Sequence, residues 1–231
     1  RQKLGIKTGK VAELGCGTGN FIGYVPMQKG YQFTGVEIDK ISGNIAKRLY
    51  PESTIHINSL EKVKLSNNFD LVIGNVPFGR FAPYDPQFRC YASWNLHNYF
   101  IAKALDLLKD GGHLVVLTSS STMDQPGSMA NILMQKAGVV EAYRLPKNTF
   151  AGTEVVADIL IIKKGFTEDL SGNLKFVETG DNTGKVEINS YFAKHPEHIF
   201  GTLSKTGRMY GKTDTTTVLP GEKCLSEYFA E

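Results

Sequence analysis

Short runs of branched apolar residues alternate with helical patterns along the first two thirds of the chain. Strands of this length, separated by helix-length segments, are typical of a parallel sheet covered by helices on both faces. The helical patterns fall at 20–29, 40–50, 96–109 and 127–137. The strand-like runs read KVAEL, QFTGVEI, STIHIN, FDLVIGN, GHLVVLTS, VVEAYRL and ADILIIKK.

Two of these segments define the sheet further. In NYFIAKALDLLKDGG the apolar residues recur at helical spacing, and we expect Asp110, Gly111 and Gly112 to end the helix. The connection between the last two strands is too short for a crossover helix, so we predict that they pair antiparallel. The pattern predicts seven strands, mostly parallel.

The composition and the pattern of apolar residues change from about residue 166 onward. Segments such as TEDLSGNLKF and ETGDNTGKVE are rich in Gly, Asn and Asp and resemble hairpins. We predict a domain boundary near 165, which separates residues 1–165 from a small C-terminal extension, residues 166–231. In this extension we expect a hairpin, a short helix near 189–195 and few core residues.

Composition narrows the class of protein. With 231 residues and 41% hydrophobic content, the chain can fill one core. No apolar run of 18 residues and no secretory signal occur, so we expect a cytoplasmic protein without a membrane partner. Three widely spaced cysteines indicate neither a disulfide framework nor a zinc site, and we predict no metal site. A net charge of +3 permits a nucleic-acid partner without requiring one. The abrupt start suggests a piece of a longer protein.

A glycine-rich loop follows the first strand in VAELGCGTGNF. Glycines allow positive φ and let a ligand lie against bare backbone, beside the free N–H groups of the next helix. About twenty residues later Glu37 ends the second strand, where it would accept hydrogen bonds from ribose hydroxyls, with Ile38 against an adenine. By itself the loop also fits a dinucleotide site. The predicted cofactor residues here are Glu13, Gly15, Cys16, Gly17, Gly19, Asn20, Phe21, Glu37 and Ile38.

ELGCGTGNF and GVEID together resemble the class I methyltransferases that bind S-adenosylmethionine. The resemblance implies a Rossmann-like α/β fold, in which the loop wraps the methionine and ribose part and Glu13 helps to place the amino acid moiety. The third strand ends at Asn58, Ser59 and Leu60, where the family usually has an Asp that accepts from the adenine amino group. The Asn58 amide oxygen can replace it more weakly, or Asn58 is a turn residue. Phe100 stands where an aromatic often edges the adenine, although core packing explains it equally.

The fourth strand closes in DLVIGNVPFGRF, at the edge of a sheet where ligands gather. NVPF resembles the N-P-P-[YF] motif of amino-group methyltransferases. The resemblance implies that the Asn75 side chain and the Val76 carbonyl accept hydrogen bonds from a substrate amino group, with Phe78 stacked on its ring. Pro77 matches the motif, whereas Val76 replaces the usual first proline and costs some backbone stiffness.

The chemistry needs such acceptors. An exocyclic amine on a heteroaromatic ring donates its lone pair into the ring, so acceptors that pull its hydrogens out of plane free that pair to attack. The motif contains no cysteine, which disfavours covalent attack on a ring carbon. Transfer to nitrogen needs no general base before attack.

Further aromatic and basic residues are candidates for substrate contact. Phe150, in LPKNTFAGTEVV, resembles a later motif that would hold a flipped base against Phe78, or it is a core residue. Stacking is worth about 1–3 kcal/mol per base, which offsets much of the cost of unstacking, roughly a few kcal/mol. Segment 79–98 either contacts nucleic acid or forms a lid. Its candidates are Arg80, Tyr84, Arg89, Tyr91, Trp94 and His97.

The order of these motifs resembles gamma-type N6-adenine DNA methyltransferases. The tail INSYFAKHPEHIFGTL with GRMYG resembles the methylase module of large helicase-linked proteins of bacterial mobile elements. The resemblance implies adenine methylation in DNA, with helicase or target-recognition segments outside these residues. Methylation of RNA or of a protein glutamine is an alternative. A non-catalytic cofactor- or DNA-binding module that supports a helicase is another.

Overall fold

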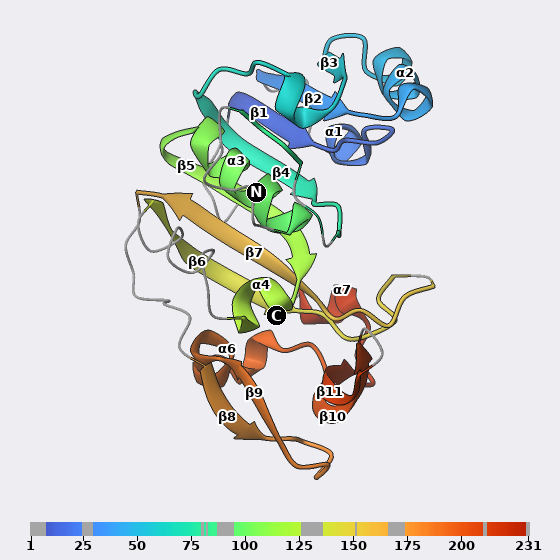
Figure 1. The fold of residues 1–231 in the computed structure, drawn as a ribbon, viewed down its shortest axis with the longest axis vertical. Coiled ribbons are helices and arrows are strands. Elements are labelled where there is room, and N and C mark those ends of the chain that lie inside the picture. Colours follow the sequence, from blue (N-terminus) through green and yellow to red (C-terminus); the bar gives the residue numbers. More distant parts are fainter. Residues whose placement is uncertain are drawn as a thin grey trace.

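The strand-like runs build one mixed sheet in the computed structural model. Its strand order is β3-β2-β1-β4-β5-β7-β6, and β7 runs antiparallel to both of its neighbours (Figure 1). The Rossmann-like sheet with an antiparallel last strand is thus confirmed. The strands are β1 (Gly9–Leu14), β2 (Tyr31–Glu37), β3 (Thr54–Ile57), β4 (Phe69–Asn75), β5 (Leu108–Ser119), β6 (Ala137–Arg144) and β7 (Ala157–Lys164).

The structure describes most of the chain. The described residues are 8–24, 30–79, 81, 83–86, 95–125, 136–150, 152–165, 174–209 and 212–229. The helices of the sheet region are α1 (Asn20–Tyr24), α2 (Lys40–Leu49), the 3-10 turn η2 (Leu60–Lys62), α3 (Leu96–Leu107) and α4 (Ser121–Asp124). The later part of the predicted helix 20–29 and nearly all of 127–137 lie outside the described residues. No described helix is long and apolar enough to cross a membrane.

Helices cover both faces of the sheet because successive strand residues point to opposite sides. On one face, Val11 packs in a cluster with Ile22 of α1 and Ala46 of α2. On the other, Ala12 belongs to a larger cluster with Leu105 of α3. Apolar strand residues thus find partners on both faces of the sheet, which explains the nearly continuous apolar runs.

The end of α3 differs from the prediction. The helix stops at Leu107, and β5 begins at once with Leu108, whose backbone is extended. Gly111, with φ of +76°, lies within β5 beside an irregularity in the pairing with β4. The glycine pair thus shapes a bulge in the strand instead of ending the helix.

The C-terminal extension lies together beyond β6 and β7, at the end of the sheet opposite β3 (Figure 1). It contains two hairpins, one of which was predicted, and the short helix was also predicted. Its elements are β8 (Leu174–Glu178), β9 (Lys185–Asn189), α6 (Ser190–Lys194), η4 (Pro196–His198), β10 (Thr202–Met209), β11 (Lys212–Leu219) and α7 (Leu225–Tyr228).

The expectation of few core residues in this extension is wrong. Val186, Ile188 and Phe192 are buried in the same cluster as Ala142 of β6 and Leu160 of β7. Alternate apolar residues of β9 face the sheet, and a pattern of only five residues is too short to reveal this from sequence. The boundary near residue 165 stays a prediction.

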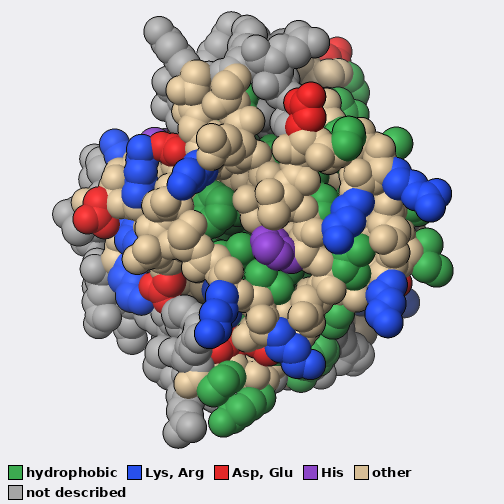
Figure 2. Space-filling model, turned by 90° about the horizontal axis from the view of Figure 1, so that it is seen from above, with side chains coloured by type: hydrophobic (Ala, Val, Ile, Leu, Met, Phe, Trp, Pro, Cys, Tyr) green, Lys and Arg blue, Asp and Glu red, His purple; other side chains and the backbone are tan. Residues whose placement is uncertain are grey.

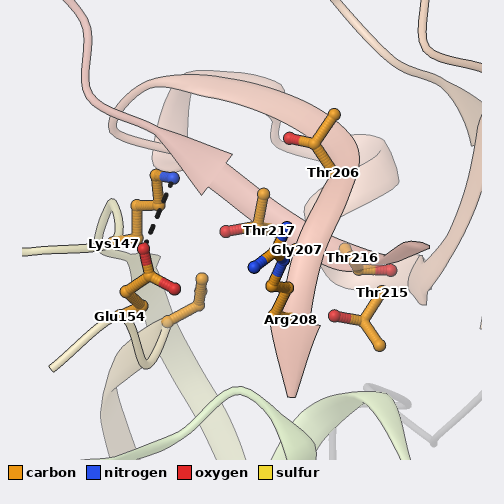
Figure 3. A pocket seen from close by; sticks show the side chains of 9 residues that line it. Lys147, Glu154, Thr206, Gly207, Arg208, Thr215, Thr216 and Thr217 are labelled. Carbon is orange, nitrogen blue, oxygen red and sulfur yellow. Dashed lines mark ion pairs between the residues drawn. The ribbon is translucent and has the colours of Figure 1, made fainter. Parts of the chain in front are cut away.

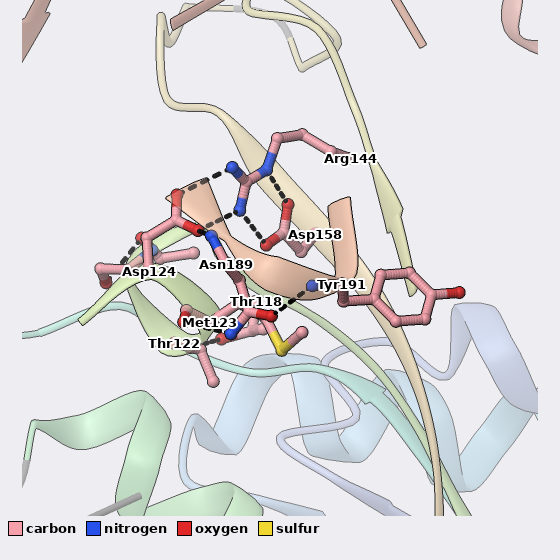
Figure 4. A network of polar contacts seen from close by, with 10 residues as sticks. Thr118, Thr122, Met123, Asp124, Arg144, Asp158, Asn189 and Tyr191 are labelled. Carbon is pink, nitrogen blue, oxygen red and sulfur yellow. Dashed lines mark hydrogen bonds and ion pairs between the residues drawn. The ribbon is translucent and has the colours of Figure 1, made fainter. Parts of the chain in front are cut away.

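A buried arginine joins the extension to the sheet (Figure 4). The fully buried Arg144 guanidinium donates to Asp158 at 2.9 and 2.8 Å and to Asp124 at 2.7 and 3.0 Å. Asp124 also accepts from the backbone N–H of Asn189, and the ring of Phe192 lies 4.2 Å from the guanidinium carbon. Two carboxylates thus neutralise one buried cation, and contacts from β9 and α6 connect the extension to this network.

Candidate active site

The glycine loop after β1 is held against the end of β2. The backbone N–H groups of Gly15 and Cys16 both donate to the Val36 carbonyl, at 2.8 and 3.0 Å. Gly19 has φ of +89°, and a Cβ built on it would lie 2.5 Å from the ring of Tyr50. Conformation and packing therefore both require glycine at this position.

Glu37 braces this loop through its side chain. One carboxylate oxygen accepts from the Gly17 backbone N–H at 2.7 Å, and the other accepts from Asp39 at 2.8 Å. Each oxygen has a further lone pair that can accept from a ligand hydroxyl. The residue predicted to bind a ribose thus also sets the shape of the loop.

Glu13 is a buried carboxyl beside the loop. Its side chain is 3% exposed, and its Oε2 atom has no hydrogen-bond partner within the described part of the chain. The pKa of Glu13 is raised to about 8, mainly because the group is buried; a backbone hydrogen bond from Ile22 lowers it and the negative charge of Glu37 raises it. The group is therefore largely protonated at neutral pH, and a cationic ligand group would favour its ionised form.

A cavity of about 450 Å³ opens at the carboxyl edge of β1, β2 and β4. Asn58 lies in it, where its amide oxygen already accepts from the Ser59 backbone N–H at 2.9 Å. The buried Ser59 hydroxyl has no partner among the described residues. Predicted residues that line the cavity are Gly15, Glu37, Ile38, Asn58, Ser59, Leu60, Asn75 and Pro77.

Phe100 and several residues that were not predicted also line the cavity. Phe100 packs against the core as well, and its contact with an adenine stays a prediction. Sequence reasoning missed Phe81 and Pro83, although the signal was present in GRFAP, where the chain leaves the motif at the edge of the sheet. The remaining unpredicted lining residues are Val36, Glu61 and Leu96.

Several predicted cofactor residues do not line this cavity. Gly17, Gly19, Asn20 and Phe21 shape the loop or begin α1. Cys16 is buried, and its sulfur would lie 2.8 Å from a Cβ built on Gly35. Burial raises the pKa of Cys16 to about 12, with the charges of Glu13 and Glu37 adding to the effect. Its thiol is therefore unreactive and serves packing.

The N-V-P-F motif lies beside the glycine loop. Ile73 pairs with Glu13 in the sheet, so Asn75, two residues further along β4, comes level with Gly15. A Cβ built on Gly15 would lie 4.0 Å from the Pro77 ring. Asn75 is exposed at the end of its strand, next to the cavity.

The surroundings of Val76 explain why valine replaces the first proline of the motif. Its side chain is 4% exposed and packs in the core, while its backbone N–H donates to the Leu117 carbonyl of β5 at 3.2 Å. Proline lacks this N–H, so the substitution adds a hydrogen bond that holds the motif on the sheet. This bond offsets the lost stiffness that the sequence suggested.

The two aromatic candidates are partly exposed, as a stacking surface must be. Phe78 is 48% exposed and Phe150 is 39% exposed. Phe78 packs edge-on against His97, with ring centroids 6.2 Å apart. His97 is buried, and burial lowers its pKa, so it is a neutral packing partner rather than a contact for phosphate. Tyr84 is exposed. Arg80, Arg89, Tyr91 and Trp94 lie outside the described residues.

A buried ion pair pins the segment after the motif to α3. Asp85 accepts from the Tyr99 hydroxyl at 2.7 Å and from the Lys103 ammonium at 2.6 Å, and all three side chains are buried. This contact holds Phe81 and Pro83 over the cavity. A lysine among the buried residues of α3 was the available signal, but its partner is not readable from sequence.

One face of the molecule has no large patch of a single charge among its described residues (Figure 2). On the end of the molecule that carries β2, β3 and α2, the described Lys and Arg side chains are spread among acidic and apolar ones (Figure 2). This pattern agrees with the small net charge of +3.

Two curated proteins are similar in sequence to part of this chain. Defense against restriction protein B of Escherichia phage P1 is 33% identical over 169 residues, covering 69% of this chain and 7% of that protein. Type II methyltransferase M.TthHB8I of Thermus thermophilus is 29% identical over 178 residues, covering 69% of this chain and 40% of that protein. The chain therefore spans less than half the length of either relative.

Solved structures share the fold. The type I restriction-modification system methyltransferase subunit from Streptococcus thermophilus superposes with a TM-score of 0.61 at 16% identity, covering 84% of this chain and 48% of that one. The sequence model of the Eco57I restriction-modification methylase family matches residues 32–150, which include β3 to β6, all of β2 but its first residue, and the N-V-P-F motif. The chain belongs to the Eco57I restriction-modification methylase family.

Proposed function

We propose that this chain transfers a methyl group from S-adenosylmethionine to the exocyclic amino group of adenine in DNA. One observation carries the proposal: Asn75 and Pro77 of the amine-binding motif line the same cavity as Glu37, Ile38 and Asn58. A donor held by β2 and β3 would then lie next to the substrate amine at the end of β4. Membership of a restriction-modification methylase family supports DNA as the substrate.

The chain's residues fit the cofactor. The unpartnered Oε2 of Glu13 suits the ammonium of the methionine part, and the free lone pairs of Glu37 suit the ribose hydroxyls. Ile38 and Phe100 supply apolar surface for an adenine, and the Asn58 amide oxygen can accept from its amino group. When bound, S-adenosylmethionine supplies a methyl group on a positively charged sulfur.

The motif residues would prepare the substrate amine. The Asn75 amide oxygen and the Val76 carbonyl accept its two hydrogens, which frees the nitrogen lone pair for attack. The hydrogen bond from the Val76 N–H to Leu117 holds this backbone on the sheet, which favours a fixed position of the Val76 carbonyl. Phe78 offers its exposed ring to one face of the base, and Phe150 offers the second.

Arg80, which follows the motif directly, is proposed as a further contact to the substrate. Target-recognition or helicase segments would lie outside these residues, which agrees with the 7% coverage of the phage P1 relative. The intact motif disfavours a purely binding module, because such a module has no need for an amine-polarising amide.

The test is transfer of a radiolabelled methyl group to DNA, RNA and protein by the wild type and by Asn75→Ala. Asn44→Ala is the matched control, because Asn44 is exposed on α2 and bonds only its own helix. We expect labelling of DNA by the wild type and the control, and none by Asn75→Ala. Equal labelling by the wild type, Asn75→Ala and Asn44→Ala would refute the catalytic role of Asn75. Labelling of RNA or protein alone would refute DNA as the substrate.

A further inference from the structure

A second concavity lies between the β10–β11 hairpin and the connection from β6 to β7 (Figure 3). It has a volume of about 250 Å³ and is separate from the cavity beside Asn75. Its lining is polar and includes two cations, one carboxylate and several threonine hydroxyls. The lining residues are Lys147, Glu154, Val156, Thr206, Gly207, Arg208, Thr215, Thr216 and Thr217.

The two walls of this concavity are joined by backbone contacts. The Lys147 N–H donates to the Val218 carbonyl of β11 at 2.8 Å. Within the connection, the Thr149 hydroxyl donates to the Pro146 carbonyl at 2.7 Å and the Thr153 N–H donates to the Phe150 carbonyl at 3.3 Å. One backbone hydrogen bond thus ties the hairpin to the start of the turn that carries Phe150.

Arg208 and the Thr215 hydroxyl have no hydrogen-bond or ion-pair partner among the described residues. No carboxylate within the described residues pairs with Arg208, and Lys147 approaches Glu154 only at 4.0 Å. An exposed pair at that distance contributes little. The Thr215 hydroxyl oxygen is buried without a partner among the described residues. A buried hydroxyl in this state loses free energy unless a ligand or water completes it.

A bulge turns Arg208 toward this space. The register of β10 shifts on both sides of Gly207, where a Cβ would lie 2.6 Å from the Thr215 carbonyl oxygen. Only glycine allows the strands to approach so closely at this point. In Figure 3 the Arg208 guanidinium points into the gap, toward Thr217 and the Lys147–Glu154 pair.

An arginine guanidinium has N–H donors in a planar arrangement that matches the oxygens of a phosphate group. Hydroxyls beside it can donate further hydrogen bonds to the same group. The sequence of residues 202–219 has three basic residues and one acidic residue, Asp214. Lys147 lies three residues before Phe150, the aromatic proposed to stack on the flipped base. A phosphate is joined to its base through a single sugar, so a phosphate site belongs close to the stacking ring.

We infer that Arg208 and Lys147, with the hydroxyl of Thr215, bind a backbone phosphate of the DNA strand that carries the target adenine. This inference rests on the proposed function. Such a contact carries no sequence information; it fixes the register of the strand relative to Phe150. The C-terminal extension then takes part directly in holding the substrate.

The test measures binding of a fluorescent DNA oligonucleotide at several salt concentrations. The variants are Arg208→Ala, Lys147→Ala and Thr215→Val, and Lys175→Ala is the control, because Lys175 is an exposed cation on β8. We expect Arg208→Ala and Lys147→Ala each to flatten the slope of log affinity against log salt by about 1, the effect of one lost phosphate contact. We expect Thr215→Val to weaken binding with the slope unchanged, and Lys175→Ala to match the wild type.

Calorimetry of S-adenosylmethionine binding by the same variants verifies that the fold is intact. The inference would be overturned if Arg208→Ala and Lys147→Ala kept the wild-type slope of log affinity against log salt. It would also be overturned if the wild type showed no salt-dependent binding to DNA, or if the variants lost affinity for RNA but not for DNA. Methyl labelling of the same DNA by the wild type reports separately on the proposed function. An active enzyme with unaltered slopes would therefore contradict this site alone.

Discussion

The Glu37 carboxylate lies 2.7 Å from the backbone nitrogen of Gly17, and this contact ties the end of β2 to the glycine loop that follows β1. Its second oxygen accepts from Asp39, whose side chain in turn caps α2 by accepting from the Ser42 N–H at 2.7 Å. One side chain thus organises the two segments that border the cavity.

Replacement of Glu37 should therefore weaken cofactor binding. Hydrogen bonds to charged groups contribute about 1.5–3 kcal/mol each, so we expect Glu37→Ala to lower the affinity for S-adenosylmethionine about tenfold or more. Glu37→Gln keeps one acceptor oxygen, so its affinity should lie between those of the wild type and Glu37→Ala. Calorimetric titration gives the affinities, and a Glu37→Ala chain that binds as tightly as the wild type would refute the assignment of this loop.

Gly19 should tolerate alanine less well than another glycine of similar conformation. Gly19 and Gly111 both have positive φ, +89° and +76°, but a Cβ on Gly111 would meet no atom within 4 Å. Alanine in this region costs roughly 1–2 kcal/mol at either site, and the clash with Tyr50 adds about 1–3 kcal/mol at Gly19 alone. Urea unfolding of Gly19→Ala and Gly111→Ala measures the difference, and equal losses would mean that Tyr50 does not confine the loop.

Stability should fall with pH because of Glu13. Its pKa is 4.5 in the unfolded chain and is raised to about 8 in the fold by burial. Between these values the folded chain holds the proton and the unfolded chain does not, so the free energy of unfolding declines as pH rises, by up to about 1.4 kcal/mol per pH unit. The neighbouring titratable groups are Glu37 and Cys16.

Glu13→Gln removes this titration and keeps the shape of the side chain. Denaturant unfolding of both chains at intervals from pH 5 to pH 8 should therefore show a shallower decline for the variant. Parallel curves for the two chains would mean that Glu13 is ionised in the fold.

Arg144 should be essential for stability. Arg144→Met leaves Asp158 and Asp124 without their buried cation, and breaking a buried pair in this way costs about 3–5 kcal/mol. Arg48→Met, at an exposed position of α2, should cost far less. Thermal and urea unfolding provide the comparison. A loss below 1 kcal/mol for Arg144→Met, on the order of a surface pair, would show that the network is not structural.

Local patterns predicted much of the fold and the site. Branched apolar runs marked all seven strands of the sheet, and residues as distant as Gly15, Asn58 and Asn75 do line one cavity. The strand predictions are confirmed by the sheet, and parallel strands bring their carboxyl ends to one edge, which is why these residues lie together. Their roles in binding and catalysis stay predictions.

Long-range contacts were beyond the reach of such patterns. The Asp85–Lys103 pair and the hydrogen bond from Val76 to Leu117 join segments whose spacing carries no periodic signal. The share of the C-terminal extension in the core was missed because short strands such as β9 present too few residues to show which face is buried. The clamp formed by Phe78 and Phe150 stays a prediction.

The most direct test identifies the methylated nucleoside. DNA is incubated with S-adenosylmethionine and the wild type or Asn75→Ala, digested to nucleosides and analysed by mass spectrometry. The account predicts N6-methyladenine with the wild type and none with Asn75→Ala. Methylation at carbon 5 of cytosine, or N6-methyladenine formed equally by Asn75→Ala, would contradict it.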